Sequence, residues 1–334
     1  MMKLIRTTGR GAAQAAARIA ALEARAGAAL DAVLPAVSGI VIAVRKGGDK
    51  ALLRFAAQFD GLAGRGALRV TRAEMEAAWE VTDPEFRKAL STAGAQIRRF
   101  AKRQMPKSWD FLPIAGLRTG QLVRSLASVG CYVPSGRHPL PSTLLMTAIP
   151  AQVAGVERIA VVSPKPAPET LAAAYLLGID EFYRAGGAHA IAALAYGTES
   201  IAPVDKIVGP GNSWVTAAKR LVAFDCGIDM LAGPTEIVVI SDTGNAREIA
   251  SDFVAQAEHD PEALAIFITT RAQLAAGVIT ETKQQSRNNP TAKEALHSNG
   301  VVIVASNVDE ARAITNRIAP EHLTVDSAMD LDWV

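Results

Sequence analysis

The spacing of hydrophobic positions changes along the chain and divides the sequence into two parts. Before about residue 122, apolar residues recur at three- and four-residue spacing and Gly or Pro marks the breaks, which is typical of helices. The predicted helices are Ala13 to Gly27, Val37 to Asp60 and Arg72 to Met105. From about Leu122, short β-branched runs alternate with helical segments, and this alternation is typical of βαβ units.

The second part contains short, nearly continuous apolar runs, as strands of a parallel sheet covered on both faces require. These predicted strands are Arg158 to Ser163, Glu181 to Ala185, Lys206 to Val208, Glu236 to Ile240, Leu264 to Thr269 and Val301 to Val304. The helices predicted between and after them are Pro168 to Leu177, Ala188 to Tyr196, Ser213 to Val222, Ala246 to Glu258, Arg271 to Thr282 and Val308 to Ile318. The pattern predicts two successive open α/β units, joined near Gly227 to Thr235.

Size and composition fit a helix-rich protein of about two domains. The chain has 334 residues, 49% of them hydrophobic and 5% aromatic, whereas a single domain usually holds roughly 100–200 residues. The formal net charge is +2, from 35 basic and 33 acidic residues. We therefore expect neither nucleic acid nor a membrane as a partner. A local excess of basic residues between Arg98 and Lys107 falls on a helical pattern and predicts a solvated face.

Cysteine use and the first residues are compatible with a reducing compartment. Cys131 and Cys226 lie far apart without metal-type spacing, which argues against a disulfide scaffold and a thiolate zinc site. No His or basic partner is identifiable beside Cys131, so we interpret it as structural. The start, Met1 to Arg10, does not resemble a signal peptide, and no sequence run approaches the roughly 20 apolar residues that span a bilayer. We expect a cytoplasmic protein.

The densest polar signal in an otherwise apolar helix is the run from Gln256 to Asp260, QAEHD. In a continuous helix, Gln256 and His259 share one face, so an amide oxygen and an imidazole could bind one metal ion. The alternative is a polar helix end before Pro261. The residues alone leave both interpretations open.

A second polar cluster is Glu321-His322, which follows Pro320 and leads into the apolar run Leu323 to Val325. An adjacent Glu and His at a helix-to-strand turn suit acid–base catalysis, because His titrates near neutrality and a partly buried Glu can be shifted there. An exposed loop pair is the alternative.

Gly-rich turns follow several predicted strands. They are Gly186-Gly187, Gly209-Pro210-Gly211-Asn212 and Gly233-Pro234-Thr235. Ligands of open α/β sheets bind at strand ends, and helix N-termini bind phosphates. None of these turns matches the GxGxxG fingerprint, so each alone is explained as a structural turn. Together they favour a nucleotide crevice.

Read together, these elements resemble the histidinol dehydrogenase family, and the match runs from the N-terminal helices to the last residues. The matching stretches, in order, are GCYVPSGRHPLPSTLLMTAIPAQVAGV, VDKIVGPGNSWVTAAKR, GIDMLAGPTE, FVAQAEHDPEA and RIAPEHL. The resemblance implies a homodimeric enzyme that oxidises L-histidinol through L-histidinal to L-histidine, with Zn2+ and two NAD. It also implies two Rossmann-like α/β domains with small terminal arms.

The resemblance further implies a division of the chain. We expect a helical arm over 1–26, a discontinuous α/β domain over 27–121 plus 234–334, and a Rossmann-like NAD-binding domain over 122–233. The family continues past Val334 with a C-terminal arm, missing here, that supplies an Asp and a His as further zinc ligands. Without them, the chain as given is expected to bind zinc poorly and to be inactive.

Carried over residue by residue, the resemblance makes Gln256 and His259 zinc ligands. It makes His322 the base that takes the alcohol proton and Glu321 the group that activates water on the aldehyde. All four would contact the substrate. Thr235 stands where the family usually has a substrate-binding Ser, and the hydroxyl is kept.

The resemblance also names residues for NAD. Tyr132 and Asn212 match nucleotide-binding positions of the family. His189 stands where a Gln commonly touches NAD, although its ring can still donate one hydrogen bond. Ser135 likewise replaces a usual Gly.

Two other interpretations stay open. Thr235 and His189 are the hints for a related dehydrogenase of the same fold that acts on another small amino or sulfonated alcohol. A chain that lacks part of its metal site is also compatible with a non-catalytic nucleotide-binding or dimerising module. The presence of the acid–base pair and of two ligands favours the enzyme.

Overall fold

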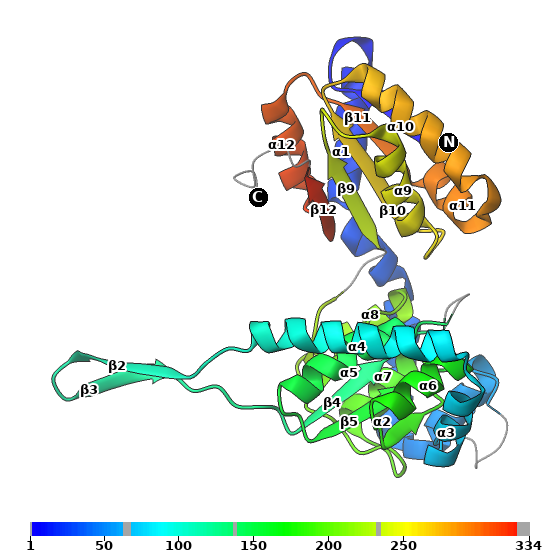
Figure 1. The fold of residues 1–334 in the computed structure, drawn as a ribbon, viewed down its shortest axis with the longest axis vertical. Helices are drawn as coiled ribbons and strands as arrows, with labels where there is room; N and C mark the ends of the chain where they lie inside the picture. The colour runs from blue at the N-terminus through cyan, green and yellow to red at the C-terminus, as the bar shows by residue number, and fades with distance from the viewer. Residues whose placement is uncertain (1, 63–67, 136–138, 232–234, 326–334) are drawn as a thin grey trace. The chain divides into compact units, whose positions relative to one another are not determined.

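A computed structural model describes residues 2–62, 68–135, 139–231 and 235–325. The chain forms two compact units (Figure 1). Unit 1 comprises Met1–Ala29 and Gly233–Val334, and unit 2 comprises Leu30–Ala232. In sequence, unit 2 is therefore an insertion between two segments of unit 1.

Unit 1 is built on a parallel sheet which, among the described residues, has five strands in the order β1-β11-β10-β9-β12. The strands are β1 (Lys3–Arg6), β9 (Glu236–Ile240), β10 (Leu264–Thr269), β11 (Val301–Val304) and β12 (His322–Val325). Successive side chains of a strand face opposite sides of the sheet. In β9, Ile237 and Val239 thus join one hydrophobic cluster, and Val238 and Ile240 join another.

Helices cover both faces of this sheet. One face carries α9 (Ala246–Ala257), α10 (Ala272–Gln285) and α11 (Pro290–Ser298), and the other carries α1 (Ala12–Glu23) and α12 (Val308–Ile318). Two short 3-10 helices, Gly9–Gly11 and Ser286–Asn288, precede α1 and α11. Unit 1 is therefore a three-layer α/β/α unit.

Unit 2 repeats this plan with a second parallel sheet, which in the described ranges has the strand order β6-β5-β4-β7-β8. The strands are β4 (Ser128–Tyr132), β5 (Arg158–Val162), β6 (Glu181–Tyr183), β7 (Lys206–Val208) and β8 (Gly227–Ile228). One face packs against α2 (Arg25–Phe59), α7 (Gly187–Tyr196) and α8 (Ser213–Val222). The cluster on the other face includes α3 (Arg72–Val81), α4 (Pro84–Gln104), α5 (Pro141–Val153) and α6 (Pro168–Leu176).

The two sheets share one strand order, because β11-β10-β9-β12 in unit 1 corresponds to β6-β5-β4-β7 in unit 2. In unit 1 the chain adds β10 and β11 to one side of β9 and then crosses to its other side with β12, and in unit 2 it does the same around β4. The crossing places a topological switch point between β4 and β7, and another between β9 and β12. The predicted pair of open, Rossmann-like α/β units is confirmed.

The N-terminal segment differs from the predicted helical arm over 1–26. Lys3–Arg6 forms β1, which pairs in parallel with β11, and α1 packs on the sheet of unit 1 through Ile19 and Leu22. The grouping of residues 30–121 also differs from the expected division, because they belong to unit 2. The reason is packing: α3 and α4 bury their apolar faces in the same cluster as α5 and α6.

The single helix predicted from Arg72 to Met105 is wrong, because α3 ends at Val81 and α4 begins at Pro84. Asp83 caps α4 by accepting from the backbone N–H groups of Glu85 and Phe86. Proline suits the first helical position, where its missing N–H costs nothing. The sequence signal for the start of a new helix is therefore the pair Asp83-Pro84.

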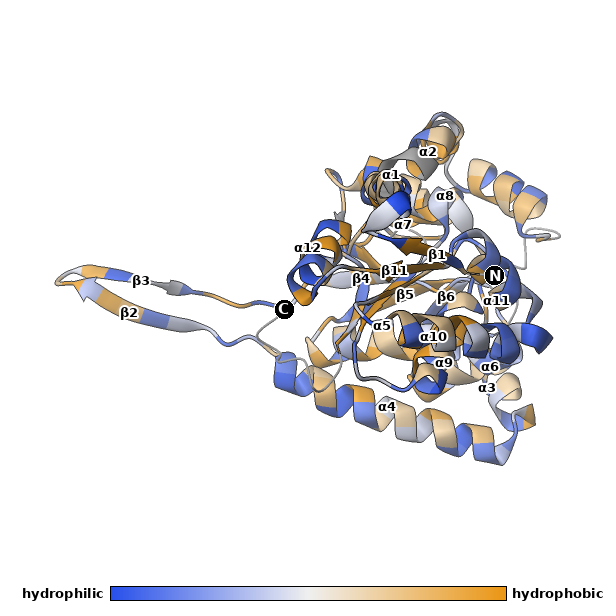
Figure 2. Ribbon diagram, turned by 90° about the horizontal axis from the view of Figure 1, so that it is seen from above, coloured by the Kyte–Doolittle hydropathy of each residue, from blue (hydrophilic) through white to orange (hydrophobic). Residues whose placement is uncertain are grey.

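Directly after α4, the antiparallel hairpin of β2 (Trp109–Ile114) and β3 (Leu117–Gln121) projects away from the sheet of unit 2 (Figure 1). Every residue of both strands is exposed. Hydrophobic and hydrophilic residues alternate along the hairpin and along α4 (Figure 2). Among the described residues, no helix has the length and apolar character needed to span a membrane.

Candidate active site

The predicted acid–base pair lies at the amino-terminal edge of the unit 1 sheet. Helix α12 ends at Ile318, and Ala319 takes a left-handed conformation (φ 46°) that turns the chain into β12. Glu321 Oε2 accepts from the backbone N–H of Glu236 at 3.2 Å, and His322 Nδ1 lies 3.1 Å from the carbonyl oxygen of Glu236. Both side chains are thus anchored on the first residue of β9.

Gln256 approaches the same sheet edge from α9. A helix that connects two parallel strands runs back along the sheet, so its end returns to the edge where those strands begin. There the Gln256 side-chain amide donates to the hydroxyl of Thr235, the residue before Glu236. The structure therefore brings together four predicted site residues, Thr235, Gln256, Glu321 and His322, around the start of β9.

His259 does not share a helical face with Gln256, so that part of the sequence interpretation is wrong. Helix α9 ends at Ala257 and Glu258 is its C-cap, which leaves the exposed His259 two residues past the helix. The residue before a proline is steered away from helical conformation, and here Asp260 precedes Pro261. The relation of His259 to Gln256 is set by the bend, not by helical spacing.

The cluster at the start of β9 stays partly open to solvent. The side chains of Glu321 and His322 are 38% and 56% exposed, and their carboxylate and imidazole lie 3.6 Å apart. Gln256 and Thr235 are half-buried. A hydroxyl, an amide, a carboxylate and an imidazole at one accessible edge can bind a small polar molecule and move protons on it.

The opposite, carboxyl-terminal edge of the unit 1 sheet is closed by its own polar groups. Asp242, just past β9, accepts from the Thr269 hydroxyl at 2.8 Å and from the Thr270 backbone N–H at 2.6 Å. Burial alone would raise the pKa of Asp242, but the hydrogen bonds from Thr270 and Thr269 outweigh it and lower the pKa. The carboxylate at this edge is thus hydrogen-bonded within the protein, whereas the cluster at the amino-terminal edge is exposed.

In unit 2, the turn Gly186-Gly187 follows β6 and is held by buried side chains. Asp60 accepts from the Gly186 N–H at 2.9 Å and lies 2.8 Å from His189 Nε2. The Tyr132 hydroxyl accepts from the Gly187 N–H at 3.1 Å. His189 and Tyr132 are 2% and 4% exposed, and burial raises the pKa of Tyr132 to about 12. These buried side chains therefore fix the backbone of the Gly186-Gly187 turn.

Asn212 lies in the turn that follows β7, and it is exposed. Its side-chain oxygen accepts from the backbone N–H groups of Trp214 and Val215, so Asn212 is the N-cap of α8. Tyr132 ends β4 and Gly209 follows β7, so the two residues flank the topological switch point of the unit 2 sheet. The predicted turn residues Gly233 and Pro234 lie outside the described residues.

Cys131 is completely buried next to Tyr132. Burial raises the pKa of its thiol to about 12, although a hydrogen bond with the Thr147 side chain acts in the opposite direction. A thiolate nucleophile is therefore not available here. The structural interpretation of Cys131 is confirmed.

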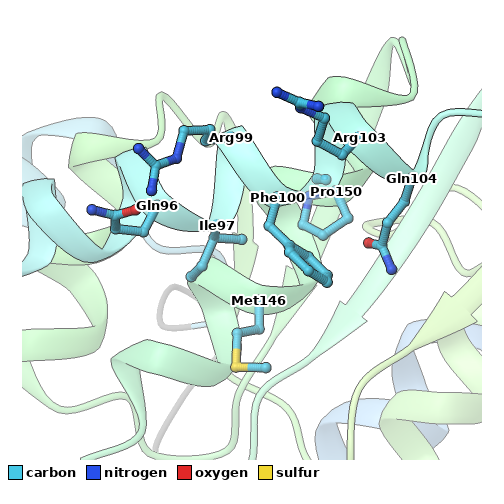
Figure 3. A pocket seen from close by; sticks show the side chains of 9 residues that line it. Gln96, Ile97, Arg99, Phe100, Arg103, Gln104, Met146 and Pro150 are labelled. Atoms are coloured by element: carbon cyan, nitrogen blue, oxygen red, sulfur yellow. The ribbon is translucent and has the colours of Figure 1, made fainter.

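A cavity of about 730 Å3 lies between α4 and α5 and contains none of the predicted site residues. Phe100 and Met146 lie in this cavity, whereas Arg99 and Arg103 extend from α4 away from Met146 (Figure 3). Phe100 and Met146 are 66% and 64% exposed. The predicted solvated basic face of α4 thus borders an exposed apolar surface.

Sequence reasoning did not single out three residues that hold the turns of unit 2. Asp60 binds the Gly186 N–H, and the side chains of Lys219 and Asp229 bind the backbone of Gly209. Lys219 carried a usable signal, because it lies on the helical face of α8 that otherwise holds Val215, Ala218 and Val222. A lysine in an apolar stripe indicates a buried partner. Asp60 carried no such signal, because it follows the last helical residue, Phe59.

A family model, sequence relatives and a solved structure point to the same family. The sequence model described as histidinol dehydrogenase matches residues 23–334. A histidinol dehydrogenase from Methanothermobacter thermautotrophicus is 44% identical over 318 residues, covering 92% of this chain and 74% of the relative. One from Geobacillus kaustophilus is 46% identical over 305 residues, covering 89% and 72%. A crystal structure of histidinol dehydrogenase from Elizabethkingia anophelis is similar with a TM-score of 0.88 and 31% identity, covering 100% of this chain and 78% of the other.

Proposed function

The chain belongs to the histidinol dehydrogenase family, a family of oxidoreductases, and on this premise we propose that it oxidises L-histidinol through L-histidinal to L-histidine, completing histidine biosynthesis. NAD supplies the oxidising power by accepting one hydride in each of the two oxidations. The observation that carries the proposal is the convergence of Thr235, Gln256, Glu321 and His322 on the start of β9.

His322 is the base of the first oxidation. A carbonyl oxygen only accepts hydrogen bonds, so the contact with Glu236 puts the ring proton on Nδ1. The side chain is 56% exposed, and its other nitrogen, Nε2, then carries the lone pair. It can take the hydroxyl proton of the alcohol as the hydride leaves the same carbon, which yields the aldehyde.

Glu321 acts in the second oxidation. Its Oε2 is bound by the Glu236 N–H, whereas the carboxylate remains partly exposed. A carboxylate in this position can take a proton from water as the water oxygen adds to the aldehyde carbon. His322, protonated in the first oxidation, returns that proton to the aldehyde oxygen, so a neutral hydrate is formed. As the second hydride leaves the hydrate carbon, His322 takes one hydroxyl proton, and the carboxylic acid is formed.

Zinc is the metal we assign to Gln256 and His259. The Gln256 amide nitrogen donates to Thr235, which leaves Oε1 as the donor atom for a metal. His259 offers an exposed imidazole, a preferred zinc ligand. Catalytic zinc takes about three protein ligands, and within the described ranges no three His, Cys, Asp or Glu side chains form a metal cluster. At least one further donor is therefore needed. When bound, zinc would hold the substrate and stabilise charge on its oxygen.

Thr235 and Gln256 would also position the substrate. The Thr235 hydroxyl accepts the bond from Gln256 and keeps its own proton for a second partner, so it can donate to a polar group of histidinol. A bound substrate would thereby be oriented between this hydroxyl and the base His322. Correct orientation of reacting groups is a large part of enzymatic rate enhancement.

We assign NAD to the switch point of the unit 2 sheet, between β4 and β7. Ligands of open α/β sheets bind outside the carboxyl ends of the strands at such a point. Asn212 is exposed there and can contact the cofactor directly. Tyr132 and His189 are buried and act through the Gly186-Gly187 turn, whose backbone they hold directly or through Asp60.

The protein partner we propose is a second copy of this chain, bound through the β2–β3 hairpin. Isolated two-stranded hairpins are marginally stable in water, yet Trp109, Phe111, Leu112, Ile114 and Leu117 are each 50–67% exposed here. At roughly 150–250 Å2 for a large side chain, these five expose on the order of 500 Å2. That is most of the about 800 Å2 that each partner buries in a standard interface.

The same chain offers a complementary surface for this hairpin. The apolar cavity between α4 and α5, with exposed Phe100 and Met146, lies next to the hairpin in sequence, since α4 ends at Gln104 and β2 starts at Trp109. In the proposed dimer, the β2–β3 hairpin of each copy packs on the α4–α5 cavity of the other. The same contact is thus made twice, as an isologous dimer requires.

The two thiols support a cytoplasmic location. Cys131 and Cys226 are both free and buried. Proteins of oxidising compartments commonly use cysteines in disulfides, whereas reducing compartments keep them as thiols. We therefore infer that the protein works in the cytoplasm.

Steady-state turnover tests the proposed function. The purified protein, supplied with zinc, NAD and L-histidinol, is expected to form two NADH for each histidine produced, and this result would overturn the sequence-based expectation that the chain as given is inactive. A panel of small amino and sulfonated alcohols serves as the comparison. A higher kcat/KM for one of these would assign another substrate, and NAD binding without turnover of any alcohol would favour a non-catalytic nucleotide-binding module.

A further inference from the structure

A buried lysine lies beneath the turn that follows β7. Lys219, on α8, is 2% exposed. Its ammonium donates to the carbonyl oxygen of Gly209 at 2.5 Å and to Oδ1 of Asp229 at 2.6 Å. The catalytic scheme above does not use this charge.

Asp229 completes the arrangement from the end of β8. Its Oδ2 accepts from the Gly209 N–H at 2.7 Å, and its Oδ1 also accepts from the Met230 N–H at 2.7 Å. One ion pair therefore binds both backbone polar groups of Gly209. The backbone of this residue cannot rotate without breaking a bond to a charged group, and such bonds are roughly twice as strong as neutral ones.

The conformation held in this way is unusual. Gly209 has φ +116°, in the region that favours glycine, and a Cβ at this position would overlap the carbonyl oxygen of Tyr132. The turn is thus pressed against the end of β4 at the switch point. From Gly209 the chain passes through Pro210 and Gly211 to Asn212, the N-cap of α8.

Stability alone does not account for a charged pair at this position. Replacement of a buried ion pair by apolar side chains of similar volume is often neutral or stabilising, because burying charges is costly. An apolar side chain in place of Lys219 could fill the space, but it could not bind the Gly209 carbonyl. The particular contribution of the pair is to fix the geometry of the turn.

We propose that Lys219 is a positioning residue for dinucleotide binding, which with Asp229 fixes the Gly209–Asn212 turn in the shape that receives the pyrophosphate of NAD. The proposal rests on the proposed function, because it assumes that NAD binds at this switch point. Lys219 touches the turn and not the nucleotide. It therefore acts on affinity for the pyrophosphate and not on hydride transfer.

The test is NAD binding to the full chain by calorimetry, comparing the parent protein with Lys219→Met. The variant is expected to bind NAD and ADP-ribose about tenfold or more weakly, because small displacements of binding groups carry large costs. At saturating NAD its kcat is expected to stay within about twofold of the parent, since the base and the substrate site are in unit 1. The matched control is Arg220→Met, which removes the neighbouring exposed charge and is expected to bind NAD normally.

The outcomes separate the two proposals. A parent protein that does not bind NAD overturns the proposed function itself. A parent that binds NAD and a folded Lys219→Met variant that binds it equally well overturn only the role of Lys219. If Lys219→Met does not fold, the double variant Lys219→Met/Asp229→Asn, which leaves no unpaired carboxylate, is measured instead. Failure of the double variant to fold would assign the pair to the fold and also overturn the proposal.

Discussion

The Nδ1 atom of His322 lies 3.1 Å from the carbonyl oxygen of Glu236, and this contact selects the tautomer of the ring. His322→Asn is expected to lower kcat for histidinol by roughly 10²–10⁴-fold, the usual contribution of a general base, because asparagine cannot take up the alcohol proton. Steady-state NADH formation measures the effect. A kcat within about twofold of the parent would place the base on another residue.

Glu321→Gln is expected to affect the two oxidations unequally. The glutamine oxygen can still accept from the Glu236 N–H, so the local backbone is kept, but the carboxylate that takes the proton from water is lost. NADH formation from histidinal should fall by about 10²-fold or more, whereas the first oxidation is less affected and histidinal accumulates. Equal losses with histidinol and histidinal would contradict the assigned role.

Thr235→Val removes the hydroxyl that Gln256 contacts and keeps the side-chain shape. A hydrogen bond of this kind contributes about 0.5–1.5 kcal/mol, so KM for histidinol should rise by roughly 3- to 10-fold. Thr235→Ser is the matched control, because it keeps the hydroxyl and should retain the parent KM. If the serine variant behaves like the valine variant, the methyl group matters and not the hydroxyl.

Cys131 makes the fold sensitive to alkaline pH. Burial raises the pKa of its thiol from 9.0 to about 12 in the folded chain. Between these values the unfolded chain binds fewer protons than the folded chain, so the free energy of unfolding decreases as the pH rises. The stabilisation that the protonated Cys131 thiol contributes to the free energy of unfolding is fully present below about pH 9. It is lost towards pH 12, at up to about 1.4 kcal/mol per pH unit.

Urea unfolding at several alkaline pH values measures this dependence. Cys131→Ala should flatten the slope by up to that amount, and it should leave turnover intact because the thiol is not a nucleophile. The folded parent should also resist thiol alkylation at Cys131. Rapid alkylation of this residue under native conditions would contradict the assigned burial.

Phe111→Asp is expected to weaken dimerisation through the β2–β3 hairpin. A charge in the centre of an apolar contact must be desolvated without a partner, which costs several kcal/mol. Sedimentation velocity across a concentration series should show the dimer dissociating at higher protein concentration than for the parent. Phe224→Asp, at an exposed phenylalanine outside the hairpin, is the control. Equal weakening by both variants would argue against the hairpin as the interface.

The core strands of unit 1 could be predicted because each is an apolar run buried on both sides. The predicted ranges for β9, β10 and β11 coincide with the observed ones. β1 could not be predicted in the same way, because its four residues, KLIR, include two charges and, among the described strands, it pairs only with β11. Nothing local in such a short edge strand identifies its distant neighbour.

The chemistry of the candidate site could be read from residue types, but its assembly could not. Glu321 and Glu236 are 85 positions apart, and their contact depends on β12 pairing with β9 in the register that aligns His322 with Ile237. The mistaken helical pairing of His259 has a local cause, since the bend before Pro261 overrides the periodicity of α9. Register and helix ends are therefore where sequence reasoning fails here.

The pairing of β1 with β11 sets an order for folding during synthesis. Lys3–Arg6 leaves the ribosome before unit 2, but its neighbour Val301–Val304 is made almost 300 residues later, after the whole of unit 2. Domains generally fold as they emerge, N-terminal segments first, and distant pairings form slowly. Unit 2 is a continuous segment and can therefore complete its core first. Until the later strands of unit 1 are made, the apolar residues of β1 and α1 have no sheet to pack against. β1 is therefore made long before the strand that it pairs with, and the sheet of unit 1 can be completed only after unit 2 has been synthesised.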